Sequence, residues 1–147
     1  MLLEALQTAV FNRLRSSDEL DAVLARNAVI PGRPAIYDHV PQVVDPENDD
    51  HFPYIVMDLD PLGWDTDTEL GFSVEVILHA YTRHGGNRVV RKIQDLCYNI
   101  LHRKESSLVV SGGEVILINF ESAPTAPLDG RTYRGVQIFT VFVEGME

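Results

Sequence analysis

The stretch FSVEVILHAYTRHGGNRVVRKIQDLCYNIL, residues 72–101, decides the fold of this 147-residue chain. Its first ten residues alternate in polarity with a period close to two, which predicts a half-buried β-strand over 72–81. A Gly-Gly pair at 85–86 ends the strand, and Asn87 is the expected N-cap of a helix. Apolar residues then recur at helical spacing, so we predict that this amphipathic helix covers 88–102.

Apolar spacing upstream of this unit predicts four more elements. We expect a helix over 2–16 and a second, short helix over 18–26 that Asp18 caps. A short strand over 35–40 comes next, followed by an acidic loop rich in proline. Another strand begins at Pro53, and it should pair antiparallel with the strand quoted above.

Two further strands close the chain. Alternation predicts them over 114–121 and 132–144, with Ile116, Ile118 and Phe120 of the first facing the core. The connection between them is about ten residues long, whereas hairpin loops usually have two to five, so we predict a projecting arm. The arm residues that mark it are Pro124, Pro127, Asp129 and Gly130.

This order of elements predicts a single α+β domain over residues 1–147. Sequential strands and helices of this kind form an antiparallel or mixed β-sheet with the helices packed on one face. A chain of 147 residues can bury roughly two-thirds of its unfolded surface, which is enough for one core. Repeats, low-complexity tracts and composition breaks are not evident in the sequence.

Charge is segregated along the chain. Eleven of the 22 acidic residues lie at 38–75, and positions 34–82 contain neither lysine nor arginine. At 83–104, six basic residues accompany a single acid, Asp95. Such sorting indicates surfaces with separate tasks, and contact with other copies of the chain is the first interpretation to test. The simpler interpretation is that an acidic loop and a solvated helix face merely adjoin in sequence.

Composition restricts the possible partners and location. A net charge of -10 argues against general nucleic-acid binding, which requires a basic surface. The one cysteine, Cys97, falls within an apolar helical pattern, so we expect a buried thiol and no disulfide. The chain has no basic signal-peptide start and no apolar run near the ~18 residues of a membrane helix. We therefore expect a soluble protein of a reducing compartment, with no membrane contact.

Chemical motifs are weak, and we expect no catalytic site, metal or cofactor. Asp65, Asp67 and Glu69 resemble the start of a calcium loop, but the required glycine and the final glutamate are missing. Ser111 lacks the glycine two positions earlier that a nucleophile elbow has. The histidines do not show zinc-protease spacing, and the Gly-Gly pair lacks the partners of a phosphate loop.

The chain resembles the tail completion proteins of long-tailed bacteriophages, which include tail terminators and tail-to-head joining proteins. The resemblance rests on the Phe52–Val56 strand opening, the Val74–Thr82 strand, the glycine break and the helix after it. It continues through Gly112–Phe120 and the closing hairpin from Leu128 to Val143. It covers nearly the whole chain.

The resemblance implies a tail-terminator-like fold and a structural role in the virion, at the head-tail junction. Its expected partners are copies of itself in a ring, with a hexamer implied, the tail tube protein and the head connector or head-completion protein. DNA would pass through only as cargo. Such a protein would assemble in the cytoplasm of the host bacterium, encoded by a phage, a prophage or a phage-derived particle.

Two assignments of the segregated charge fit such a ring. The acids could meet basic residues of the next subunit, because a ring joins different surfaces of neighbouring copies. Alternatively, the acids could line the ring's lumen and keep passing DNA from sticking. The residues concerned are Asp58, Asp60, Asp65, Asp67, Arg88, Arg91 and Lys92.

Two other function classes stay open from the residues alone. One is a monomeric or dimeric protein-binding adaptor of the same fold. The other is a small metal-assisted hydrolase that would use Asp65, Asp67, Glu69 and His79.

Overall fold

The computed structural model describes residues 3–64, 71–83 and 86–145. Within these ranges, three α-helices and two short 3-10 helices accompany a six-stranded sheet. The elements are, in chain order, α1 (Leu3–Arg15), α2 (Asp18–Val23), β1 (Ile36–Tyr37), η1 (Asp49–His51), β2 (Tyr54–Trp64), β3 (Gly71–Arg83), α3 (Gly86–Leu101), η2 (Glu105–Ser107), β4 (Gly113–Ser122), β5 (Thr125–Pro127) and β6 (Thr132–Gly145).

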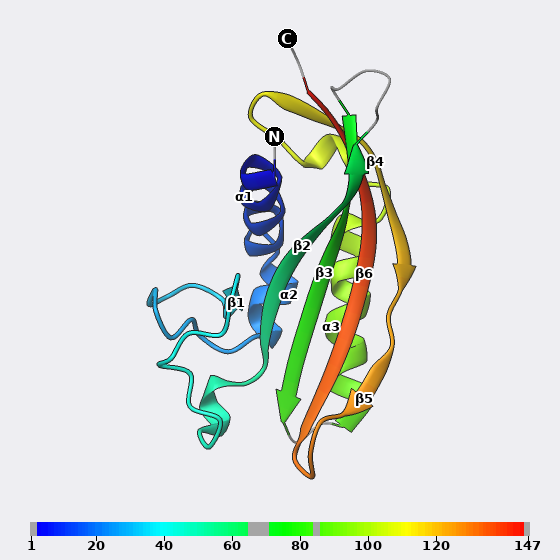
Figure 1. Cartoon of the computed structure of the whole chain (residues 1–147). Coiled ribbons are helices and arrows are strands. Elements are labelled where there is room, and N and C mark those ends of the chain that lie inside the picture. The colour runs from blue at the N-terminus through cyan, green and yellow to red at the C-terminus, as the bar shows by residue number, and fades with distance from the viewer. Residues whose placement is uncertain (1–2, 65–70, 84–85, 146–147) are drawn as a thin grey trace.

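The sheet has the order β1-β2-β3-β6-β4, with β5 paired to the lower part of β6 (Figure 1). The β2–β3, β3–β6 and β4–β6 pairs are antiparallel, and β1 is parallel to β2. The sheet is therefore mixed, and the predicted α+β class and β2–β3 hairpin are confirmed. Strand β6 lies between β3 and β4, so β4 is at the edge of the sheet.

Helix α3 lies behind the sheet in Figure 1, with α2 and α1 to its left, and the buried residues of all three share one core with the sheet. The alternation of β3 puts Val74, Val76 and Leu78 under these helices, where they are fully or almost fully buried. The largest fully buried side chain, Phe139 of β6, belongs to the same core cluster as Leu6 of α1. We call the helix-free face, which carries Glu75 and Ile77 on β3, the outer face.

Helix α3 and strand β6 approach each other closely at Gly135. A Cβ placed there would come within 2.4 Å of Val90 Cγ1, so the helix could not sit at this distance against any larger residue. Beside this contact, the buried Gln137 Nε2 donates to the backbone oxygen of Gln94 at 2.9 Å. These contacts fix the direction in which α3 presents its exposed side.

Both predicted helix N-caps were wrong, and α2 ends at Val23 instead of the predicted 26. The hydroxyl of Ser17, not Asp18, caps α2 by accepting the Leu20 N–H at 3.2 Å. Helix α3 already begins at Gly86, so Asn87 lies inside its first turn. Gly86 has φ 51°, a left-handed conformation that glycine adopts without strain.

The predicted inward face of β4 was wrong at one position. A register shift between Val115 and Leu117 places two residues of β4 against one interval of β6, and Ile116 is the extra residue. As a result, Val115 is buried and Ile116 is 43% exposed, while Ile118 remains fully buried as predicted. Period-two reasoning cannot anticipate a bulge, because one inserted residue exchanges the two faces.

Candidate functional site

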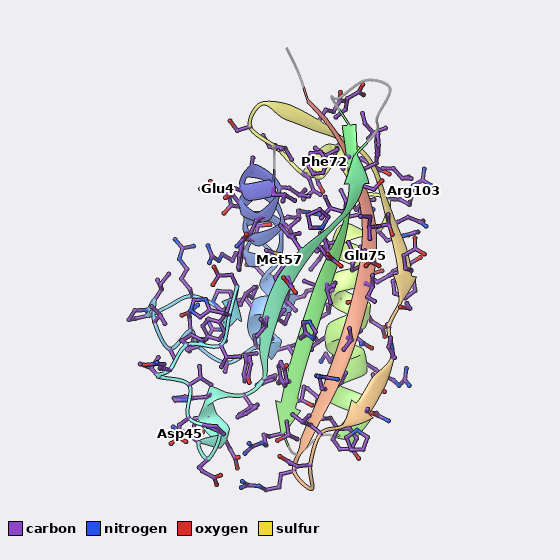
Figure 2. All side chains as sticks on the ribbon, in the orientation of Figure 1. Glu4, Asp45, Met57, Phe72, Glu75 and Arg103 are labelled. Carbon is purple, nitrogen blue, oxygen red and sulfur yellow. The ribbon has the colours of Figure 1, made fainter. Side chains whose placement is uncertain are left out.

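The acidic part of the sequence divides into two structural regions. The first is the acidic loop, residues 41–52, which lies at the lower left in Figures 1 and 2 and contains the labelled Asp45. The second is the outer face, where Asp58 and Asp60 of β2 and Glu75 of β3 project. The predicted residues Asp65 and Asp67 lie outside the described residues.

The acidic loop is tied down by a cation from the start of the basic segment. Arg83, whose side chain is only 5% exposed, donates from Nη1 to Asp49 Oδ1 at 2.9 Å. Its Nη2 donates to the backbone oxygen of Pro46, and its Nε to Thr132 Oγ1 at 2.7 Å. Arg83 is therefore an internal anchor, which its position in the basic segment did not reveal.

An apolar cluster completes this anchor. The Arg83 guanidinium carbon lies 4.2 Å from the centre of the Phe52 ring, a cation–π contact. Phe52 in turn contacts Tyr54, which stacks on Tyr81 with ring centres 5.0 Å apart. Burial, and secondarily Tyr81, raises the pKa of Tyr54 to about 12, so its phenol stays protonated at neutral pH. The acidic loop thus covers one end of the outer face.

The acids farther up the outer face have a different environment. Asp58 and Asp60 are exposed, as the alternation of β2 predicted, and neither pairs with a cation within the described ranges. Asp60 stands directly opposite Glu75 in the β2–β3 ladder. Like charges opposite each other destabilise a sheet, so this pair has no benefit within the isolated subunit.

His79 lies on the same face, between Val56 and Val136 in the ladder. Burial of the ring, and then the nearby Arg134 cation, lowers its pKa below the ordinary value, while Asp58 opposes this. Its buried Nδ1 has no hydrogen-bond partner in the described structure. His79 is therefore held neutral near pH 7.

Helix α3 carries the predicted basic cluster on its exposed side. Arg88, Arg91 and Lys92 are all exposed and make no ion pair with any described carboxylate. The helix covers the face of the sheet opposite to the one that bears Asp58 and Asp60. Within one subunit, the acids of the outer face and the cations of α3 therefore form two separate groups that do not contact each other.

The predicted arm lies against the sheet over part of its length. Thr125–Pro127 forms β5 and pairs with Tyr133–Gly135 of β6. Beyond β5, Asp129 Oδ1 accepts the N–H groups of Arg131 and Thr132, both at 2.8 Å, and closes the turn. The exposed tip includes Gly130, whereas Pro124 accepts the Val136 N–H through its backbone oxygen. The predicted arm therefore lies on the sheet as far as Pro127, and only the short turn around Gly130 is exposed.

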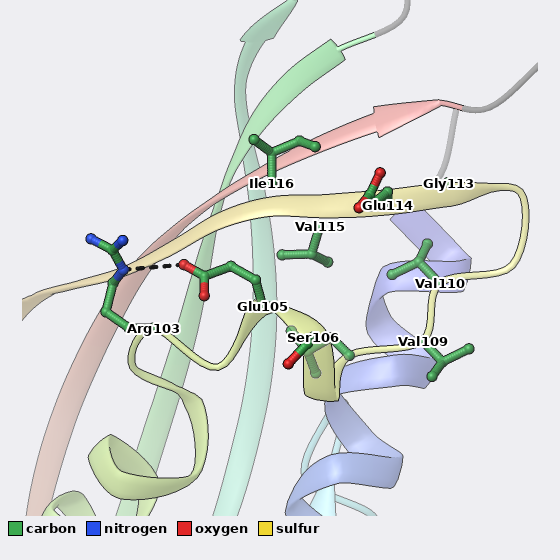
Figure 3. A pocket seen from close by; sticks show the side chains of 10 residues that line it. Arg103, Glu105, Ser106, Val109, Val110, Gly113, Glu114, Val115 and Ile116 are labelled. Carbon is green, nitrogen blue, oxygen red and sulfur yellow. Dashed lines mark ion pairs between the residues drawn. The ribbon is translucent and has the colours of Figure 1, made fainter.

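A cavity of about 560 Å³ lies between η2 and β4 (Figure 3). An ion pair between Arg103 Nε and Glu105 Oε1, 3.2 Å long, borders it. Ser106 supplies the only side-chain hydroxyl among the ten lining residues, which include no histidine or cysteine. Of the two carboxylates in this lining, Glu105 is engaged by Arg103, and there is no histidine to activate the hydroxyl.

The hydrolase alternative gains no support from geometry. The described part of the chain contains no group of three or more side chains placed to hold a metal ion. Asp65, Asp67 and Glu69, which the hydrolase would use with His79, lie outside that part.

Among the described helices, none is long and apolar enough to cross a membrane.

Comparisons with known proteins agree with the fold. Residues 8–144 match the protein family described as "Tail completion protein gp17". Among curated proteins, none matches the chain. Among solved structures, a chain described as "Virion of native gene transfer agent (GTA) particle" has a TM-score of 0.78 and 23% identity, over 98% of each chain. At this identity, the structural likeness shows a shared fold.

Proposed function

The chain belongs to the tail completion protein gp17 family, as its sequence predicted, and on this premise we propose that it caps the phage tail. In this proposal, copies form a ring, a hexamer, at the head-proximal end of the tail tube. The ring stops addition of tube subunits and presents the surface to which the head connector docks. The family match over 8–144 is the observation that carries the proposal.

This role is structural and requires no catalysis. Its partners are further copies of the chain, the tail tube protein and the head connector or head-completion protein, with DNA only as passing cargo. The protein would act at the head-tail junction of the virion after assembly in the bacterial cytoplasm.

The charge distribution supports assembly through unlike surfaces. A closed ring needs a heterologous interface, in which one surface of a subunit meets a different surface of its neighbour. The cations of α3 and the acids of β2 lie on opposite faces of the sheet and form no ion pair within the described subunit. In the first assignment, Arg88, Arg91 and Lys92 meet the acids of the next copy.

In the second assignment, the outer face lines the lumen. Asp58, Asp60 and Glu75 then form an acidic surface that repels the DNA backbone. The Asp60–Glu75 pair supports either assignment. Two acids opposite each other destabilise the isolated subunit, and both assignments give them a function in the assembled ring.

Negative-stain microscopy of the purified protein, alone and mixed with tail tubes, tests the proposal. We expect rings in the first sample and capped, length-limited tubes in the second. A monomer at high concentration, with neither rings nor capped tubes, would contradict the proposal and favour the adaptor.

Neutralising the outer face separates the two assignments. Asp58→Asn with Asp60→Asn should leave rings intact and reduce DNA delivery if these acids line the lumen. If the acids meet the next subunit, the same variant should yield monomers. Rings with normal infectivity would contradict both assignments.

A further inference from the structure

The open β-sheet has edges that could pair with other copies of the chain, and the proposed ring would bring such copies together. An open sheet has two edges, and a row of unpaired N–H and C=O groups at an edge recruits strands from other chains. Two stretches of edge are the upper part of β2, beyond its pairing with β1, and the outer side of β4 at 118–120, while β1 and β5 border the sheet elsewhere. A protein that gathers its own copies at one site must control how such edges meet.

The direction of the N–H groups on β2 is given by one hydrogen bond. The Ile55 N–H donates to the Ala35 oxygen at 2.9 Å, so it points away from β3. Without a bulge before residue 61, the N–H of Leu59 points outward too, and so does the backbone nitrogen of Pro61.

Neither of these two outward positions is free to pair with a strand. The Leu59 N–H donates to Asp58 Oδ1 at 3.0 Å. At Pro61 the ring replaces the N–H altogether. Proline is tolerated in strands where its missing donor faces the open edge, as it does here.

The β4 edge is closed by a different device. After α3, Arg103 adopts a left-handed conformation with φ 57°, and its N–H donates to the Ile118 oxygen at 3.1 Å. His102 Nδ1 accepts the Phe120 N–H at 3.1 Å, and Glu105 Oε1 accepts the Ile118 N–H at 3.4 Å. Side chains and one backbone turn thus occupy the positions that a further strand would need.

We propose that these two edge stretches, β2 at 59–61 and β4 at 118–120, are closed to strand addition, and that neighbouring copies therefore dock through side-chain surfaces without continuing the sheet there. This inference rests on the proposed ring for its partner, a second copy of the chain. The two stretches are closed by unrelated residues. An aspartate and a proline of the strand itself close β2, whereas a histidine, an arginine and a glutamate from residues 102–105 close β4. Edge closure keeps the subunit from polymerising by β-pairing while its charged faces remain available.

Opening the β2 edge tests the proposal. The double substitution Asp58→Thr with Pro61→Thr removes the cap of Leu59 and restores an outward N–H. We expect the purified variant to keep its circular dichroism spectrum and to form open-ended aggregates that bind thioflavin T. Asp60→Thr is the matched control, since it removes one acid from the same face of β2 without touching a cap. The proposal is wrong if the double variant stays as monodisperse as the parent, or if the control aggregates equally.

Hydrogen exchange gives a second measurement that needs no variant. If copies dock through side chains, the amides of Leu59, Ile118 and Phe120 should exchange at rates within about threefold in the assembled and dissociated protein. Strand addition would instead slow exchange at one of these edges by about 100-fold or more, which would overturn the proposal. If the protein forms no ring at all, the proposed function fails, but the comparison of the two substituted proteins still tests edge closure.

Discussion

The acidic loop and the outer face carry the same kind of residue but use it in opposite ways. In the loop, Asp49 reaches Arg83 and Glu47 reaches Arg131, with distances of 2.9 and 3.1 Å. On the outer face, Asp60 lies opposite another acid, Glu75, with no described cation in contact. Two of the loop's four acids therefore pair with cations within the subunit, whereas the acids of the outer face are left for solvent or a partner.

This difference shows that segregated charge in a sequence is not one feature. A loop can bend until its carboxylates meet cations, whereas a strand fixes each carboxylate on one face of the sheet. The cation that holds the loop, Arg83, ends β3 and is not on α3, so the simpler interpretation, of an acidic loop and a solvated helix face that merely adjoin, stays open for the helix. Four predictions test whether the two regions differ in this way.

The largest effect should come from Arg83→Ala. The substitution removes three hydrogen-bonding contacts and the cation–π contact with Phe52, so we expect the free energy of unfolding to fall by about 3 kcal/mol. Urea unfolding followed by circular dichroism measures it. The matched control is Arg131→Ala, whose ion pair with Glu47 is 52% and 78% exposed and should contribute at most about 1 kcal/mol. Equal losses in the two variants would remove the distinction between an anchored loop and a solvated one.

Charge reversal on α3 should abolish assembly and leave folding intact. Under the first assignment, Arg88→Glu with Arg91→Glu yields monomers in light scattering, while the unfolding free energy changes by less than about 0.5 kcal/mol, since both side chains are exposed. Lys104→Glu is the control, because it reverses an exposed cation outside the cluster. An intact ring in the double variant would exclude α3 from the interface.

Neutralising one member of the opposed acid pair should stabilise the subunit. For Asp60→Asn we expect a gain of about 0.5 kcal/mol in unfolding free energy, because repulsion with Glu75 is relieved. Glu75→Gln should give a similar gain, and the double variant less than the sum of the two. A loss of stability in Asp60→Asn would mean that the outer-face acids are satisfied within the subunit after all.

The smallest effect concerns the pH dependence of stability near η2. Hydrogen bonds from backbone N–H groups, its own first and that of Ile118, and then the Arg103 cation hold the pKa of Glu105 below its ordinary value. The charged carboxylate therefore adds stability above its unfolded pKa of 4.5, and this is lost as pH falls through the lower folded value. Glu105→Gln should flatten that part of a plot of unfolding free energy against pH. An unchanged slope would show that Glu105 is not a tight cap of β4.

Local patterns predicted most of the fold. The strand and helix within residues 72–101 result from their periods of two and 3.6, and the structure confirms both. The order of strands in the sheet was harder to obtain, because the position of β4 at the edge depends on β6 entering beside β3. The bulge at Ile116 also escaped prediction, since nothing in a single strand marks where its partner omits a residue.

The candidate surfaces were predicted in part. Alternation in β2 correctly placed Asp58 outward, and helical spacing placed Arg88 and Arg91 outward. Whether any of them lies in an interface or lumen stays a prediction. The anchoring role of Arg83 and the caps at His102 and Glu105 were missed, because each depends on a partner distant in the chain.

The sequence by itself determined which segments form strands and helices, which of their faces are apolar, and that acids and cations occupy separate segments. Periodicity is a local property, so it can be read without knowing the neighbours. Only the tertiary structure decided which charges find partners, since Arg83 meets Asp49 across 34 residues and Arg131 meets Glu47 across 84. It also decided that β4 is capped at Ile118 and Phe120, because these caps exist only where folding brings a donor and a distant acceptor within hydrogen-bonding distance.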